Sequence, residues 1–63
     1  MKCVIASSHS LKELEGLINE FYVSNDLVVD KKTLTIRNRK TGRIGEGMRI
    51  VRKGNRYRFE IFS

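Results

Sequence analysis

The residues whose type and spacing suggest a chemical role, the binding of an anionic ligand, are the arginines and lysines in the second half of the chain. Residues 31–63 contain eleven cationic and two acidic residues, a net charge of +9, whereas residues 1–30 contain two cationic and five acidic residues, a net charge of −3. The planar fork of arginine matches phosphate geometry, and neutralising several phosphates releases counterions. The sequence therefore predicts a polyanion-binding surface. The candidate nucleic-acid-binding residues are Arg37, Arg39, Lys40, Arg43, Arg49, Lys53, Arg56 and Arg58.

Strands with alternating apolar and polar residues are the elements that would position these cations. Such alternation occurs in residues 32–39, within residues 43–53 and in residues 56–62, and successive side chains of a strand point to opposite faces. One parity holds Leu34, Ile36, Ile44, Met48, Ile50, Tyr57, Phe59 and Ile61. The opposite parity includes Thr35, Arg37, Arg39, Arg49, Lys53, Arg56 and Arg58. We expect cations from three neighbouring strands to meet on one open sheet face.

Glycines mark the turns between these strands. Gly42 in the segment KTGR permits the positive φ that a short hairpin loop requires, and Gly54-Asn55 suits a two-residue type II′ turn with glycine at the first central position. Gly45 and Gly47 weaken the strand expected within residues 43–53 and indicate a bulge or a sharp bend there.

A helix is predicted over residues 11–22. Ser10 and Glu13 have the spacing of a capping box, in which each side chain bonds the other residue's backbone amide. Apolar residues recur every three or four positions at Leu11, Leu14, Leu17, Ile18 and Phe21, and the opposite face holds Lys12, Glu13, Glu15, Asn19 and Glu20. Short apolar runs at residues 2–6 and 27–30 predict strands before and after this helix.

These elements predict one α+β domain over residues 1–63. The fold is a small two-layer sandwich of order β-α-β-β-β, with a further β-strand allowed, in which one amphipathic helix packs on a mostly antiparallel sheet of three to four strands. The expected core consists of Leu14, Leu17, Ile18, Phe21, Leu34, Ile36, Ile50, Tyr57, Phe59 and Ile61. Tyr57 and Phe59 have the parity of the core face, and only Phe62 has the parity of the basic face. A single aromatic residue does not make a platform for bases, so none is predicted.

Other reactive residues are few. Cys3 is the single cysteine, which excludes an intramolecular disulfide and favours a reducing, cytoplasmic setting. Together with His9 it falls short of a metal-ligand set, so no catalytic residue, metal or cofactor and no small-molecule substrate is predicted. No apolar run approaches about 18 residues and the first ten residues do not resemble a signal peptide, so no membrane partner is expected either.

The leading hypothesis is a non-enzymatic nucleic-acid-binding module, with DNA favoured over RNA. Its basic face and its turns at residues 39–43 and 52–56 would contact the phosphate backbone. In its fold the module resembles the three-stranded-sheet DNA-binding domains of some phage and transposon integrases, although in those domains the helix follows the sheet.

A protein-interaction or homo-oligomerising module is the alternative. The acidic helix face would dock on the basic sheet of a second copy, or the segments 27–30 and 59–62 would pair across a dimer as sheet edges. The cations also suit a solvated face that keeps an open sheet from aggregating.

Overall fold

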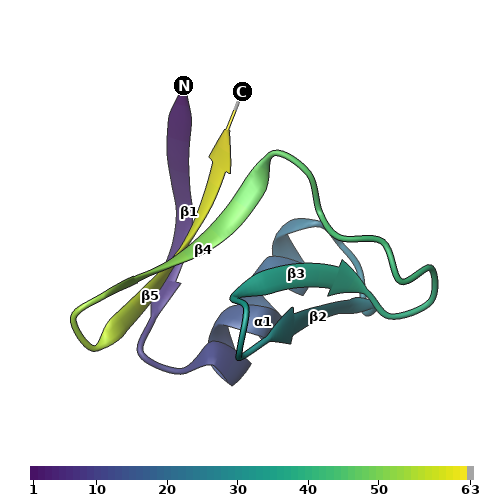
Figure 1. Cartoon of the computed structure of the whole chain (residues 1–63), viewed down its shortest axis with the longest axis horizontal. Helices are drawn as coiled ribbons and strands as arrows, with labels where there is room; N and C mark the ends of the chain where they lie inside the picture. Colours follow the sequence, from purple (N-terminus) through teal and green to yellow (C-terminus); the bar gives the residue numbers. More distant parts are fainter. Residues whose placement is uncertain (63) are drawn as a thin grey trace.

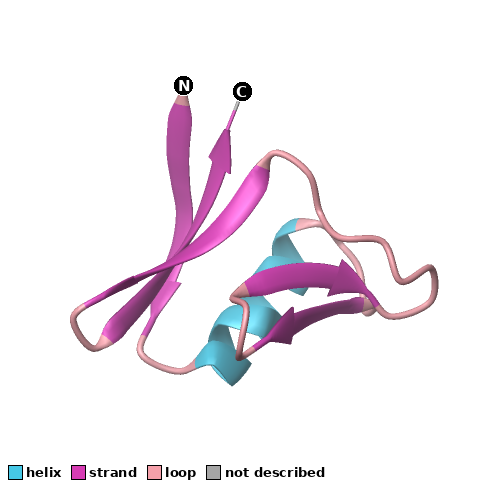
Figure 2. Cartoon of the chain, in the orientation of Figure 1, coloured by secondary structure: helices cyan, strands magenta, loops and turns pink. Residues whose placement is uncertain are grey.

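The structure, a computed structural model, describes residues 1–62. Its elements are β1 (Lys2–Ser8), α1 (Leu11–Phe21), β2 (Leu27–Asp30), β3 (Thr35–Asn38), β4 (Met48–Lys53) and β5 (Arg56–Phe62). Figures 1 and 2 show the helix behind the β2–β3 hairpin and beside the remaining strands, with the two ends of the chain close together. The predicted α+β class and the order of the elements are confirmed.

The strands of the described chain divide between two antiparallel sheets. One has three strands in the order β1-β5-β4, and the other pairs β2 with β3. The sequence predicts one sheet of three to four strands, and the described residues form two sheets instead. The division arises at Gly45–Gly47, where Gly47 has a φ of 70° and the chain bends from one sheet to the other, as the glycines predicted.

Residues on the two sides of this bend pair with different partners. Ile44 forms an isolated antiparallel bridge with Arg37 of β3, and the Gly45 amide donates a 2.8 Å hydrogen bond to the Ile36 carbonyl. Met48, just beyond the bend, is opposite Ile61 of β5. The strand predicted within residues 43–53 is therefore two segments, and only β4 belongs to the three-stranded sheet.

The turns and the start of the helix follow the sequence closely. Gly54 has a φ of 61° in the two-residue connection between Lys53 and Arg56, as the predicted type II′ turn requires. The Ser10 hydroxyl accepts a 3.2 Å hydrogen bond from the Glu13 amide. In a full capping box the Ser10 amide would donate to the Glu13 side chain. Here it donates to the Ser8 hydroxyl instead, at 3.1 Å.

Six apolar side chains form the buried core: Leu14, Ile18, Val29, Ile36, Ile50 and Phe59, among the residues described. The prediction that Leu17 and Phe21 are core residues is wrong, since Phe21 is 49% exposed and Leu17 is also exposed. Leu34 lies in the β2–β3 turn with a φ of 55° instead of in a strand, although it still packs against the core.

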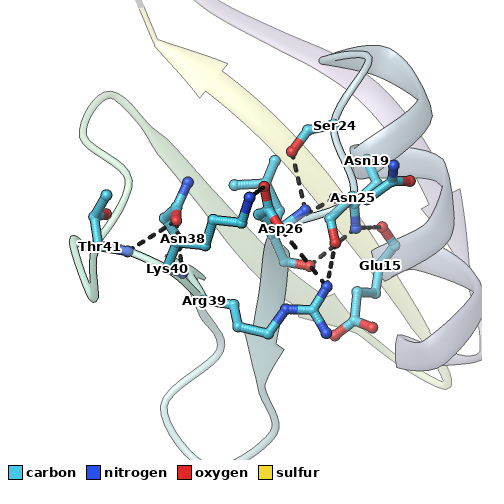
Figure 3. Close-up of polar contacts among 10 residues, drawn as sticks. Glu15, Asn19, Ser24, Asn25, Asp26, Asn38, Arg39, Lys40 and Thr41 are labelled. Carbon is cyan, nitrogen blue, oxygen red and sulfur yellow. Dashed lines mark hydrogen bonds and ion pairs between the residues drawn. The ribbon is translucent and has the colours of Figure 1, made fainter.

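The orientation of α1 explains the exposure of Leu17 and Phe21. Glu15 and Asn19, predicted to face solvent, instead bind the backbone of β2. Figure 3 shows both side chains extending from α1. The Asn19 amide group donates to the Leu27 carbonyl at 2.9 Å and accepts from the Leu27 N–H at 3.0 Å, and a Glu15 carboxylate oxygen accepts from the Val29 N–H at 2.9 Å. The side of α1 that carries Glu15 and Asn19 therefore faces β2, and Leu17 and Phe21 lie on a side of the helix that is exposed to solvent.

Candidate nucleic-acid interface

The eight candidate cations fall into two groups, because β3 and β4 belong to different sheets. The loop group, on β3 and the segment after it, consists of Arg37, Arg39, Lys40 and Arg43. The remaining four lie on the three-stranded sheet. The prediction that all these strands present their cations on one sheet face is therefore wrong.

The strand register places the second group on one side of the three-stranded sheet. Residues directly opposite each other on paired strands point to the same side. Arg49 is opposite Glu60, Val51 is opposite Arg58, and Lys53 is opposite Arg56. Lys2, opposite Phe62, joins them from β1. We define the sheet face as Lys2, Arg49, Lys53, Arg56, Arg58, Glu60 and Phe62 with the neighbouring Val4 and Val51.

Alternation within β4 and β5 confirms the predicted parity of the four cations on these strands. Lys2 was missed because its place depends on the pairing of β1 with β5 in space, which no local pattern reveals. Among the described residues the sheet face has five cationic side chains and one acidic side chain, a net charge of +4.

Glu60 is the centre of the sheet face, and its side chain is fully buried beneath the cations. Its carboxylate oxygens lie 3.1 Å from Arg49 Nε, 3.7 Å from Lys2 Nζ and 3.8 Å from Arg58 Nε. Burial raises the pKa of Glu60, but the hydrogen bond from Arg49 and the three positive charges outweigh it, so the pKa lies below its ordinary value. Glu60 therefore stays ionised and draws three cations together.

Two further contacts restrain arginines of the sheet face. The Arg49 guanidinium carbon lies 4.5 Å from the centroid of the Phe62 ring, within cation–π distance. Arg56 Nε donates a 3.2 Å hydrogen bond to the Ser7 hydroxyl of β1. Arg49 nevertheless keeps 53% of its side chain exposed, so restraint does not remove its cation from the surface.

Charges in the loop group are partly compensated, as Figure 3 shows. Asp26 lies 3.8 Å from Arg39 Nη2 and 3.7 Å from Lys40 Nζ, and the Arg39 guanidinium also donates to the Asn25 carbonyl. These contacts attach the loop after β3 to the segment that precedes β2. Arg39 and Lys40 thus have a structural role that the sequence did not indicate.

Arg37 and Arg43 are both exposed. Arg37, but not Arg43, lines a shallow hollow whose lining residues are Val28, Asp30, Arg37, Asn38, Arg39 and Gly42. The backbone amides of Lys32 and Thr33 donate to Asp30 and hold its pKa below the ordinary value, so this hollow combines a carboxylate with the arginines. With two cations, Arg37 and Arg39, and one carboxylate, Asp30, this hollow has a net charge of +1, against +4 for the sheet face, which makes it the poorer phosphate site.

The strand edges proposed for a dimer are not free. The segment 59–62 belongs to β5, the central strand, so its prediction as an edge is wrong. The outer edge of β2 is covered by Glu15 and Asn19 of α1. Glu15, one of the acidic residues expected to dock on a second copy, is therefore already bonded to β2 of its own chain.

No group of His, Cys, Asp and Glu side chains suited to a metal ion occurs in residues 1–62. Across the same residues, no helix combines the length and apolarity needed to span a membrane. Comparison of the chain with protein-family models, curated proteins and solved structures finds no match.

Proposed function

We propose that the protein is a non-enzymatic nucleic-acid-binding module whose sheet face holds the phosphate backbone. The observation that carries this proposal is the grouping of five cations on one side of the three-stranded sheet, around the buried carboxylate of Glu60. A solvated face needs charge of either sign, whereas this face has a net charge of +4. We extend the proposal to a cytoplasmic protein that acts on DNA in preference to RNA, without a cofactor or small-molecule substrate.

The dimensions of a β-sheet support this role. Neighbouring strands are about 4.8 Å apart and same-side residues along a strand about 6.8 Å apart, so a backbone that crosses the sheet face meets a cation on each strand. The long, exposed Lys53 and Arg56 side chains beside the Gly54-Asn55 turn extend the contact to the end of the hairpin. Each neutralised phosphate adds about 0.9 to the slope of log K against log salt concentration.

Two double variants test the proposal, each removing two positive charges. The sheet variant is Lys53→Gln with Arg56→Gln, and the matched loop variant is Arg37→Gln with Arg43→Gln. Binding of a labelled random-sequence DNA duplex is followed by fluorescence anisotropy at several salt concentrations. The sheet variant is expected to lose about two units of salt slope and the loop variant less than one. Equal losses, or no binding of DNA or RNA by the wild type at low salt, would overturn the proposal.

Homo-oligomerisation is the second candidate function, and exposed apolar side chains favour it. Leu17 and Phe21 line a shallow hollow together with Ile5 and Ala6, and Val23 nearby in the chain is 93% exposed. Apolar clusters of this kind often mark protein contacts. Light scattering after size-exclusion chromatography would support this candidate if the mass rises with protein concentration in the absence of nucleic acid, and a constant monomer mass would exclude it.

A further inference from the structure

Phe62 is an aromatic side chain set among the cations of the sheet face. It is 38% exposed, and its cross-strand partner is Lys2. The other aromatics of β5 have the opposite parity, and Phe59 is fully buried in the core. Besides restraining Arg49, the partly exposed ring gives the sheet face apolar surface among its cations, which suits a ligand that carries both phosphates and flat apolar groups.

The ring is held in place by a chain of contacts that starts in the protein interior. The buried Glu60 carboxylate accepts the 3.1 Å hydrogen bond from Arg49 Nε, and the Arg49 guanidinium lies 4.5 Å from the Phe62 centroid. Because the guanidinium and the ring already restrain each other, a planar ligand that packs against this pair costs little additional ordering entropy in the protein. Val4 and Val51 give the same side of the sheet further apolar surface.

Bases of a nucleic acid provide such planar groups, but in a duplex their faces are covered by neighbouring bases. A single strand can turn its bases outward onto aromatic rings and arginine planes while its phosphates meet the cations. We infer that the sheet face prefers single-stranded over double-stranded nucleic acid and that Phe62, supported by Arg49, stacks on a base. This inference rests on the proposed function and names its substrate class.

Three labelled ligands with equal numbers of phosphates per strand separate stacking from charge. They are an oligothymidine of about twelve nucleotides, an abasic strand of the same length and a duplex of the same length. Fluorescence anisotropy is measured at one low salt concentration for all three. One stacked base is expected to make oligothymidine bind the wild type about 5- to 150-fold more tightly than the abasic strand.

Phe62→Leu keeps an apolar side chain but removes the ring, and Phe62→Tyr retains a ring as the matched control. Circular dichroism spectra of both variants are compared with the wild-type spectrum to check that they fold. We expect Phe62→Leu to bind oligothymidine about as weakly as the abasic strand with duplex binding unchanged, and Phe62→Tyr to keep the preference. Equal wild-type binding of oligothymidine and the abasic strand, a duplex preference, or a preference that survives Phe62→Leu would overturn the inference while leaving phosphate binding intact. If none of the three ligands binds, the proposed function itself fails.

Discussion

Arg49 Nε donates a 3.1 Å hydrogen bond to Oε1 of Glu60, a carboxylate that is fully buried although it belongs to the cationic side of the sheet. The two residues are directly opposite each other on β4 and β5. A lone buried carboxylate is costly, whereas one that is paired and hydrogen-bonded is tolerated. Glu60 therefore makes the local concentration of positive charge compatible with folding and orients the arginine that contacts Phe62.

Glu60→Gln is expected to lower stability at neutral pH because the substitution removes the negative charge that three cations share. The pKa of Glu60 in the folded protein lies below the ordinary value of 4.5, so its contribution is present above about pH 4.5 and is lost as the pH falls through the folded pKa. The difference in free energy of unfolding between wild type and variant should therefore be largest at pH 7 and shrink in acid. Urea unfolding monitored by circular dichroism measures it.

Glu46→Gln serves as the control for that experiment because Glu46 is exposed. Asp30 also has a lowered pKa, but both proteins contain it, so its effect cancels in the difference. A gap between wild type and Glu60→Gln that does not change with pH would contradict the assigned role of Glu60.

Val23→Gly is expected to raise the free energy of unfolding by about 1 kcal/mol. Val23 has a φ of 51° just after the helix, where the amides of Val23 and Ser24 donate to the carbonyls of Glu20 and Asn19 in a Schellman motif. Glycine adopts this left-handed conformation without strain, and Val23 is 93% exposed, so little burial is lost. Thermal unfolding at constant pH checks the prediction.

A glycine in place of another exposed valine provides the matched comparison. Val4→Gly in β1 is expected to lower stability by about 1 kcal/mol, because glycine is unfavourable within a strand. If both glycine variants are destabilised to the same degree, backbone strain at Val23 is not the cause.

Asn19→Ala is expected to destabilise the protein by about 1–3 kcal/mol. It deletes two hydrogen bonds to the backbone of Leu27 and leaves the N–H and C=O of the β2 edge without those partners. Glu20→Ala, the next position on the helix but exposed, should stay within about 0.5 kcal/mol of the wild type. Chemical denaturation of both variants compares them, and equal effects would show that Asn19 does not attach the helix to β2.

Local patterns of the sequence were sufficient for the start of the helix, for the β4–β5 turn and for the alternation within β4 and β5. The spacing of Ser10 and Glu13 predicted the helix start, and Gly54 predicted the hairpin turn, because both depend on neighbours within a few residues. Period-two alternation likewise predicted the side of the sheet on which Arg49 and Arg58 lie. These features need no knowledge of the fold.

The arrangement of the strands required information from distant residues. Gly45 and Gly47 indicate a bend, but the sequence does not reveal that β3 pairs with β2 in a sheet separate from β4. It therefore predicts the cations on one surface, whereas they lie on two. Glu15 and Asn19 have ordinary surface residue types, and only the position of β2 gives them partners. The burial of Glu60 is not visible in the sequence either, because it follows from contacts with Lys2, Arg49 and Arg58 across three strands.

The central claim is that nucleic acid binds the sheet face. The most direct test is a titration of ¹⁵N-labelled protein with a short oligonucleotide, followed by amide chemical shifts in two-dimensional NMR spectra. The structure predicts the largest shifts in β4 and β5, at residues 48–53 and 56–62, with residues 39–43 of the loop little changed. Shifts confined to residues 39–43, or no shifts at saturating oligonucleotide and low salt, would contradict the claim.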